Sequence, residues 1–312
     1  MKKKKIRNIL VVFGGTSGER DVSLETGKAC IKALNSKGYK VSTFDPKKKK
    51  FSSIKKKNID IIFNALHGKN GEDGVAQSYF EYLKIPYTHS GVISSFNAMN
   101  KVNSKKIFTK NNIKTPKYFS FYKEDFEKNF IKKNIKDKKI TFPIVIKPNN
   151  EGSSLGVKVC KNEKKLFKSI RLLMRKYDEL IIEEYIGGKE IQVAVLNGNP
   201  LGAIELIPKR LFYDYKAKYT KEAKTKHVMP AGISKEKYKK VLTIAKKTHK
   251  SLNCKGVTRS DFKFYKNKFY LLEINTQPGM TSLSLVPEIA AYKGLSFENL
   301  VEKILLDAGI NK

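Results

Sequence analysis

Tryptophan is absent from this chain of 312 residues, and cysteine and histidine are scarce. The three cysteines, Cys30, Cys160 and Cys254, lie far apart and match no metal-binding spacing, so we expect reduced thiols and a cytoplasmic location. The four histidines are also dispersed, which argues against a zinc enzyme. No apolar run reaches the roughly 18 residues that a transmembrane helix needs, so we expect no membrane span.

Acidic residues are few as well. The chain carries 29 Asp and Glu against 64 Lys and Arg, a formal net charge of +35. Such a charge suggests a nucleic-acid partner, but only six of the basic residues are arginine, which nucleic-acid-binding proteins favour. We interpret the lysines as a solvated surface that attracts anionic substrates, and we expect no nucleic-acid partner. A non-catalytic nucleotide or nucleic-acid binder is the alternative from another class.

Strand and helix signals alternate over residues 6–98. Strands are predicted at Ile9–Phe13, Tyr39–Phe44 and Ile59–Asn64, with a helix from about Asp21 to Lys37 after a glycine-rich turn. This alternation predicts a parallel, doubly wound α/β sheet, with functional loops at the carboxyl ends of its strands.

The pattern changes after residue 98. A basic helix is predicted at Lys101–Asn111, followed by strands at Phe142–Pro148 and Leu180–Ile186, and the last helix is predicted near Phe297–Ala308. These signals are typical of α+β units. We therefore expect three domains, which cover residues 1–98, 99–185 and 186–312.

The strand predicted at Phe269–Asn275 carries Glu273 and Asn275 two residues apart, so both side chains project from one face. Carboxylate and amide oxygens are hard ligands of the kind that Mg²⁺ takes beside phosphate oxygens. A second carboxylate beside a guanidinium occurs in Arg259–Asp261, which precedes a predicted strand at Phe262–Phe264. The pattern indicates a magnesium–nucleotide site. Its alternative is a chance pairing at a solvated strand end.

Two further segments suit a nucleotide. Lys147 ends an apolar strand and is followed by the small-residue loop Asn150–Gly156, whose backbone N–H groups could wrap phosphate oxygens. The strand Ile181–Ile186 leads to Glu190 through two glycines, which would suit an adenosine pocket. An ordinary hairpin turn and a buried strand that ends in a turn are the respective alternatives.

In order along the chain, the sequence also contains a set of short motifs. They are Gly14–Leu24, Ala65–Gly68 with Gly71–Gly74, Pro86–Thr88 with Ser90–Val92, Asn100-Lys101, Lys147-Pro148 with Glu151–Ser154, Phe212–Tyr215 with Lys218-Tyr219, Arg259–Asp261, and Glu273–Thr281 with Ser284-Leu285. Through these motifs the chain resembles the D-alanine–D-alanine ligases of the ATP-grasp superfamily over nearly its whole length. The resemblance implies an ATP-grasp fold preceded by an N-terminal Rossmann-like parallel-sheet domain. It also implies ATP-dependent joining of two D-alanines through an acyl phosphate, for peptidoglycan synthesis.

The same resemblance implies residue roles at the nucleotide. Two Mg²⁺ (or Mn²⁺) ions would be held by Asp261, Glu273 and Asn275. ATP-binding side chains would come from Lys101, Lys147, Ser154, Glu183, Glu190 and Lys218. Because phosphoryl transfer depends on positioning and charge neutralisation, this set of cations and hard ligands fits the reaction.

At the substrates, the resemblance implies that Glu19 anchors the first D-alanine and forms a triad with Ser153 and Tyr219. His67 and Glu72 would lie near the first substrate, and Ser284 and Leu285 would receive the carboxylate of the second. Arg259 and the Gly279 backbone N–H resemble the oxyanion stabilisers of the family, and a glycine allows the close backbone approach that this needs.

Residues 208–226 resemble the mobile loop of the family, which closes over substrates and excludes water. Tyr219 in this loop favours a dipeptide ligase over a D-alanine–D-lactate ligase, the alternative within the superfamily. The resemblance further implies a homodimer. The chain departs from the family pattern at Ser260, Gln277 and Leu283, none of which is a predicted ligand.

Overall fold

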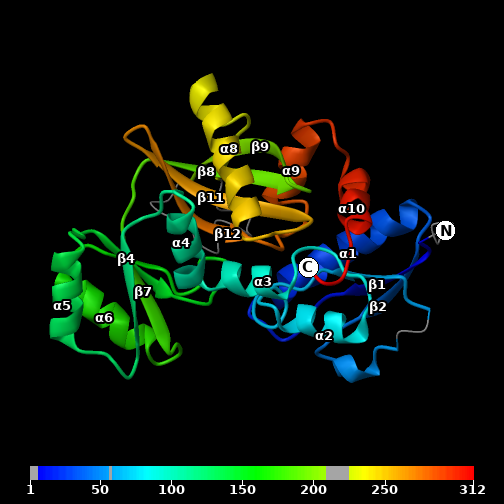
Figure 1. The fold of residues 1–312 in the computed structure, drawn as a ribbon, viewed down its shortest axis with the longest axis horizontal. Coiled ribbons are helices and arrows are strands. Elements are labelled where there is room, and N and C mark those ends of the chain that lie inside the picture. The colour runs from blue at the N-terminus through cyan, green and yellow to red at the C-terminus, as the bar shows by residue number, and fades with distance from the viewer. Residues whose placement is uncertain (1–5, 56–57, 209–224) are drawn as a thin grey trace.

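The computed structural model describes residues 6–55, 58–208 and 225–312. The described residues form three β-sheets, and we describe the chain as an N-terminal, a central and a C-terminal unit, each built on one of them (Figure 1). Within the described residues, no helix combines the length and the apolar character needed to cross a membrane.

The N-terminal unit contains a parallel sheet in the order β2-β1-β3. Its strands are β1 (Asn8–Val12), β2 (Lys40–Phe44) and β3 (Ile61–Asn64). Its helices are α1 (Arg20–Ser36), α2 (Val75–Leu83) and α3 (Val92–Met99), with a short 3₁₀ turn, η1, at Phe51–Ser53. The first strand is buried on both faces because it is central and helices cover the sheet, as expected for a doubly wound unit.

The central unit contains an antiparallel sheet in the order β4-β7-β5-β6. Its strands are β4 (Tyr118–Tyr122), β5 (Ile144–Pro148), β6 (Lys158–Cys160) and β7 (Glu179–Glu184), and α5 (Lys128–Asp137) and α6 (Glu163–Leu173) pack on this sheet (Figure 1). Buried residues on α6 recur every three or four positions, from Leu166 and Phe167 to Ile170 and Leu173, so one stripe of this helix faces the sheet.

The C-terminal unit contains a five-stranded antiparallel sheet in the order β10-β9-β8-β11-β12. These strands are β8 (Lys189–Leu196), β9 (Asn199–Ile207), β10 (Lys226–Val228), β11 (Val257–Tyr265) and β12 (Lys268–Asn275). Successive side chains of β8 point to opposite faces of this sheet. Val193 and Val195 pack with helices α4 (Lys101–Lys110) and α8 (Lys235–Ser251) on one face. Ala194 and Leu196 pack with α9 (Leu285–Tyr292) and α10 (Phe297–Leu306) on the other. Helices therefore cover both faces of this sheet.

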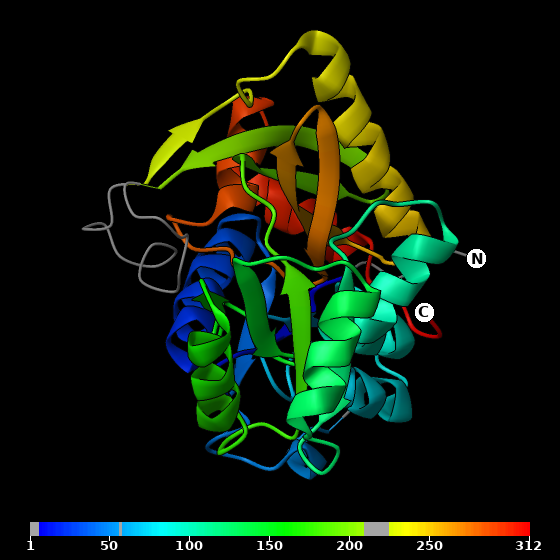
Figure 2. The same ribbon diagram turned by 90° about the vertical axis from the view of Figure 1, so that its left-hand side faces the viewer.

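Hydrophobic cores connect the units. Phe108 of α4 is buried against the five-stranded sheet, although its helix precedes the central unit in the sequence. On the opposite face, α10 packs against α1 of the N-terminal unit. Figure 2 shows the five-stranded sheet above the four-stranded sheet, with the N-terminal unit behind the latter. The carboxyl end of β3 lies beside the segment that follows β12, because Asn64 Nδ2 donates to Gln277 Oε1 at 2.9 Å.

The predicted fold class is confirmed: a parallel sheet is followed by two antiparallel α+β units. One strand boundary was wrong. We expected Arg259–Asp261 to precede a strand, but these residues lie inside β11, which begins at Val257. The polar residues fit a strand because Ser260 is fully buried and Arg259 and Asp261 face the site described next.

Candidate active site

The hairpin of β11 and β12 places four polar side chains on one face of the sheet. Asp261 lies opposite Glu273, and Arg259 lies opposite Asn275, in the antiparallel register. Because residues two apart on a strand share a face, as do directly opposed residues, all four project to the same side. A bulge follows between Asp261 and Phe262 and ends this pairing pattern.

Cations balance the two carboxylates. The Arg259 guanidinium donates from Nε and Nη2 to the two oxygens of Asp261, at 2.8 and 3.0 Å. Lys101 Nζ lies 3.5 Å from Glu273 Oε2 and donates to the Glu151 carbonyl at 2.5 Å. Burial lowers the pKa of Lys101, and the charge of Glu273 partly offsets this effect. Two carboxylates directly opposed across a strand pair repel each other, so this arrangement requires nearby positive charge.

The first turn of α4 positions Lys101. Its N-cap, Asn100, accepts a hydrogen bond from the Asn103 N–H at 2.8 Å, and the Val102 N–H donates to Asn149 Oδ1 at 2.9 Å. Asn149 follows directly on β5. The helix that carries Lys101 is therefore fixed to the start of the loop that contains Glu151.

A buried ion-pair cluster joins α4, β5 and β7. Glu183 forms two ion pairs: one oxygen lies 3.1 Å from Lys105 Nζ, and the other lies 3.0 Å from Lys147 Nζ. Burial opposes ionisation of Glu183, but the two ammonium groups outweigh this effect and lower its pKa. Lys105 was not among the predicted site residues; its only signal in the sequence is its position four residues after Lys101 on the same helix face.

A cavity lies between the central and C-terminal units. It encloses about 810 Å³ of space, part of it open to solvent. Both charged and apolar side chains line it; the lining includes Lys101, Val145, Lys147, Ser154, Leu155, Glu183, Ile186, Glu190, Asp261, Lys263 and Glu273. Glu190 forms an ion pair with Lys263 at 3.0 Å. Seven of the residues predicted to bind ATP or metal, Glu273 among them, thus line this one cavity.

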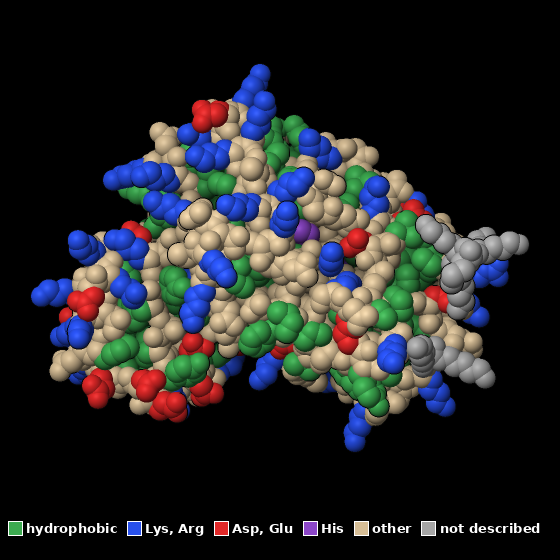
Figure 3. Space-filling view, viewed as in Figure 1, with side chains coloured by type: hydrophobic (Ala, Val, Ile, Leu, Met, Phe, Trp, Pro, Cys, Tyr) green, Lys and Arg blue, Asp and Glu red, His purple; other side chains and the backbone are tan. Residues whose placement is uncertain are grey.

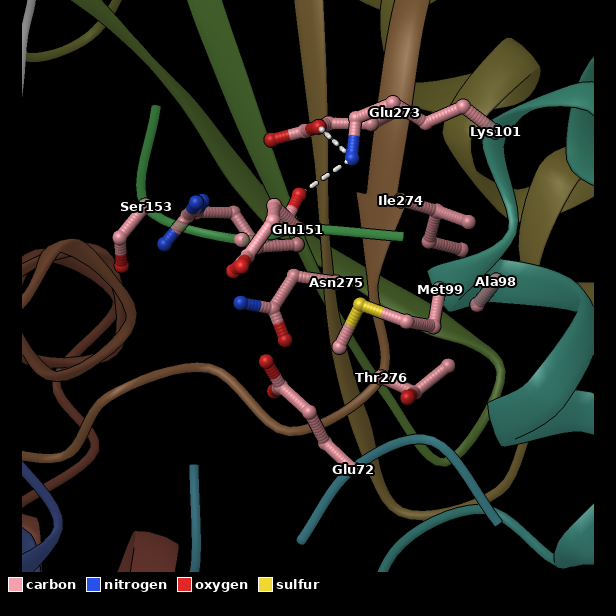
Figure 4. A pocket seen from close by; sticks show the side chains of 12 residues that line it. Glu72, Ala98, Met99, Lys101, Glu151, Ser153, Glu273, Ile274, Asn275 and Thr276 are labelled. Carbon is pink, nitrogen blue, oxygen red and sulfur yellow. Dashed lines mark hydrogen bonds and ion pairs between the residues drawn. The ribbon is translucent and has the colours of Figure 1, made fainter. Parts of the chain in front are cut away.

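A second cavity of about 480 Å³ adjoins the first (Figure 4). Lys101, Glu151 and Glu273 line both cavities. In the close-up, Asn275 points into this cavity with Glu72 below it and Glu151 above it. Ser153 and Arg259 also line this cavity.

Acidic groups from the N-terminal unit lie at this second cavity. Ser153 Oγ donates a hydrogen bond to Glu19 Oε1, so the loop after β5 reaches the start of α1. A Cβ at Gly152 would lie 3.0 Å from Glu19 Oε2, so a larger residue there would have to displace the Glu19 carboxylate slightly. Burial, and then the neighbouring charge of Glu19, raise the pKa of Glu72 well above its usual value.

His67 is neutral at neutral pH. Burial lowers its pKa to about 4, although a hydrogen bond with the backbone of Gln277 opposes this shift. Its Nε2 lies 3.0 Å from Thr26 Oγ1, which also accepts from the Met280 N–H at 3.2 Å. The ring is therefore positioned by groups from both ends of the chain and can act as a neutral hydrogen-bonding group.

The loop after β12 carries the predicted second-substrate residues. The Thr281 N–H donates to Ser284 Oγ at 3.0 Å, and a Cβ at Gly279 would lie 2.9 Å from the same oxygen. Leu285 begins α9, and its side chain is buried in the core, so only its backbone is available to a substrate carboxylate. Tyr219 and Lys218 lie outside the described residues, as does most of the predicted loop at 208–226.

The residues on the shared sheet face fit a divalent cation. Among residues 6–55, 58–208 and 225–312, no group of three or more His, Cys, Asp or Glu side chains could hold a metal ion. The predicted set contains only two carboxylates, with the Asn275 amide as the third donor. All three are hard oxygen donors from one sheet face, and two of them are like charges that a cation between them would relieve.

Comparison with known proteins agrees with this geometry. The family model described as "D-ala D-ala ligase C-terminus" matches residues 107–306, and the "D-ala D-ala ligase N-terminus" model matches residues 42–90. The D-alanine–D-alanine ligase of Pelagibacter ubique is 54% identical over 306 residues, which are 98% of this chain and 99% of the relative. That of Carboxydothermus hydrogenoformans is 43% identical over 95% of this chain and 96% of the relative.

Solved structures are similar as well. The crystal structure of D-alanine–D-alanine ligase from Bacillus anthracis superposes with a TM-score of 0.86 at 34% identity, over 96% of this chain and 97% of that one. Its complex with ATP gives 0.84 at 32% identity, over 97% of each chain. The site geometry, the family models and these full-length matches lead to one conclusion: the chain belongs to the D-alanine–D-alanine ligase family.

Proposed function

We propose that this protein joins two molecules of D-alanine to D-alanyl-D-alanine, with conversion of ATP to ADP and phosphate, and so supplies peptidoglycan synthesis. One observation carries this proposal: the cavity suited to a nucleotide and the cavity next to Glu19 share Lys101, Glu151 and Glu273. A terminal phosphate at this junction can reach an amino-acid carboxylate in the adjoining cavity.

In the first step, a carboxylate oxygen of the first D-alanine attacks the γ-phosphorus of ATP. The bond from that phosphorus to the β,γ-bridging oxygen breaks, and ADP leaves with the electron pair. Lys101 and Lys147 neutralise phosphate charge, and burial makes their charges more effective than in water. Glu19, held by Ser153, binds the substrate ammonium group.

Asp261, Glu273 and Asn275 would hold two Mg²⁺ or Mn²⁺ ions. When bound, the ions supply further charge neutralisation at the polyphosphate. The Arg259 guanidinium, through two hydrogen bonds, holds the Asp261 carboxylate in its orientation on the shared sheet face.

In the second step, the amine of the second D-alanine attacks the acyl phosphate carbonyl. The carbon–oxygen bond to phosphate breaks, phosphate leaves, and the nitrogen loses a proton. Arg259 and the Gly279 N–H stabilise the oxyanion, while Ser284 and the backbone of Leu285 bind the second carboxylate. His67 and Glu72 hold the first substrate. Glu183 and Glu190 line the part of the larger cavity that receives the adenosine, and the loop that carries Ser154 binds the phosphates.

A phosphate-release assay with D-alanine, L-alanine and D-lactate tests the proposal. Wild-type protein should release phosphate with D-alanine and form the dipeptide, while L-alanine gives none. Glu273→Gln should lower kcat by about 100-fold or more, because the divalent ions that neutralise the polyphosphate lose a carboxylate ligand. Full activity of this variant would contradict the metal assignment. Preferred formation of a D-lactate ester at neutral pH would contradict the dipeptide assignment and favour the alternative ligase.

We also propose that the protein acts in the cytoplasm as a homodimer of three-domain chains. Helices α2 and α3 contact each other, and together they expose four large apolar side chains: Val75 (50% exposed), Tyr82 (78%), Ile93 (67%) and Phe96 (51%). A neighbouring pair of helices with this exposed apolar surface is typical of an interface, and a second copy is the partner that we propose.

Light scattering tests the homodimer. The wild type should have about twice the chain mass of 35.5 kDa, and Ile93→Glu should shift the protein to the monomer without loss of fold. A monomeric wild type at micromolar concentration would refute this part of the proposal and leave the catalytic part intact.

We propose no nucleic-acid partner. Lysine and arginine side chains are scattered over the face shown in Figure 3, with acidic side chains among them, instead of forming one stripe. A duplex- or strand-binding surface would concentrate them along a groove. Salt-sensitive RNA binding without any turnover would support the non-catalytic alternative.

A further inference from the structure

Gln277 is a buried polar residue between the two halves of the candidate site. It follows β12 directly and is 1% exposed. Its side-chain oxygen accepts a hydrogen bond from Asn64 Nδ2 at 2.9 Å, and its Nε2 donates to the Leu66 carbonyl. Both partners belong to the N-terminal unit, at the carboxyl end of β3. A residue in a C-terminal loop is thus bound to a strand more than 200 positions earlier.

Asn64 is equally constrained. It is fully buried, donates from Nδ2 to the Gly71 carbonyl at 3.1 Å as well, and accepts from the Leu66 N–H at 3.2 Å through Oδ1. This amide therefore fixes the loop on which His67 lies. Because every polar atom of the Asn64 and Gln277 side chains has a partner, the pair forms a fully satisfied network.

Gln277 contacts one predicted site residue directly and the chain neighbour of another. Its N–H donates to Asn275 Oδ1 at 2.8 Å, so the orientation of the Asn275 amide depends on where residue 277 lies. Its side-chain Nε2 donates to the carbonyl of Leu66, the residue directly before His67. Gln277 thus joins a predicted metal ligand on one side to the backbone that carries a predicted substrate-binding group on the other.

We propose that Gln277 is a positioning residue of the reaction, which acts through Asn275 and His67 and is itself held by Asn64. An amide is required because the site needs one acceptor and one donor at the same place. The inference rests on the proposed function, since Asn275 is a ligand only if the divalent cation binds there. Groups that orient a metal ligand typically change metal affinity about 10- to 100-fold when removed.

Gln277→Met tests the proposal, because methionine has a similar length and no hydrogen-bonding amide. Gln77→Met is the matched control: Gln77 is also 1% exposed and also contacts the Gly71 loop, with Nε2 donating to the Gly71 carbonyl at 3.0 Å and Oε1 accepting from Gly74 N–H at 3.1 Å. Neither of these bonds involves Asn275. Both variants remove a buried amide, so both should lose stability, but only one should change the metal site.

The measurement is Mn²⁺ binding in the presence of a non-hydrolysable ATP analogue, followed by electron paramagnetic resonance. Gln277→Met should weaken Mn²⁺ binding about tenfold and raise the KM for D-alanine, whereas Gln77→Met should change Mn²⁺ affinity less than about twofold. Equal Mn²⁺ affinities in the two variants would overturn the proposal. If Gln277→Met does not fold, Asn64→Leu replaces it; its Mn²⁺ affinity should fall about threefold, and an unchanged affinity would again overturn the proposal.

Wild-type protein is assayed first for dipeptide formation. If the wild type forms no D-alanyl-D-alanine, the proposed function fails. If it does and the Gln277 and Gln77 variants bind Mn²⁺ alike, only the positioning role fails.

Discussion

At the residue scale, Glu72 destabilises the folded protein at a position that suits substrate binding. It is 7% exposed, Oε2 has no hydrogen-bond partner among the described residues, and Glu19 lies nearby. Its carboxyl group would be ionised in the unfolded chain near neutral pH, but the folded protein resists that ionisation. A charge that is unfavourable in the empty site can become favourable once a substrate ammonium group is present.

Glu72→Gln should therefore raise the melting temperature at pH 8 in the absence of ligands. The pKa of Glu72 is raised on folding, so the folded state binds more protons than the unfolded state above pH 4.5, and stability falls as pH rises through that window. The glutamine variant lacks this loss. Thermal unfolding of both proteins at pH 5 and pH 8 tests this prediction. The difference in melting temperature between Glu72→Gln and the wild type should be smaller at pH 5 than at pH 8. A variant that is less stable than the wild type at pH 8 would contradict the assignment.

Individual residues also show what the sequence could not reveal. Motifs identified Glu19, Asp261, Glu273 and Asn275, and the structure brings these residues to adjoining cavities. Asn64 lies in no motif, and Gln277 lies in the motif Glu273–Thr281 only as a departure from the family pattern. Their importance arises from burial between two units and not from local sequence. Lys105 lies among 58 lysines, and only its contact with Glu183 distinguishes it.

At the scale of elements, the predicted strands and helices lie within about two residues of the observed ones where the apolar pattern is strong. Examples are α1, predicted at about 21–37 and observed at Arg20–Ser36, and β2, predicted at Tyr39–Phe44 and observed at Lys40–Phe44. The start of β11 was missed because Arg259–Asp261 is polar. Strand register was also beyond sequence reasoning, since pairing of Asp261 with Glu273 depends on the turn and the bulge.

Helix α4 and strands β5 and β7 are joined by the cluster of Lys105, Lys147 and Glu183. Glu183→Gln should destabilise the protein by about 3 kcal/mol, because it leaves two buried ammonium groups without their counter-charge. Adding Lys105→Met to this variant should restore part of the lost stability, because one of the two unpaired ammonium groups is then removed. Urea unfolding of the two single variants and the double variant measures the coupling. If the changes in unfolding free energy of the two single variants add up to that of the double variant, the ion pair between Lys105 and Glu183 does not cause the destabilisation.

At the scale of the whole molecule, no unit contains the candidate site alone. Lys147 and Glu183 come from the central sheet, Asp261 and Glu273 from the C-terminal sheet, and Glu19 and His67 from the N-terminal unit. The division at residues 98 and 185 is still a prediction, because α4 packs on the C-terminal sheet although it precedes the central unit, and α10 packs on both the C-terminal sheet and α1. Packing between units, and not the boundaries themselves, brings the groups together.

The net charge of +35 is a property of the whole molecule, and it should make stability depend on ionic strength. Repulsion among like charges destabilises the compact state, and salt screens it with a Debye length of about 10 Å at 0.1 M. Raising KCl from 20 to 300 mM should therefore raise the melting temperature by a few degrees. The triple variant Lys47→Gln, Lys48→Gln, Lys49→Gln removes three exposed charges and should melt higher at 20 mM KCl, with a flatter salt dependence. A wild-type melting temperature that stays constant or falls with KCl would mean that local ion pairs such as Arg20–Asp45, at 2.7 Å, outweigh the net repulsion.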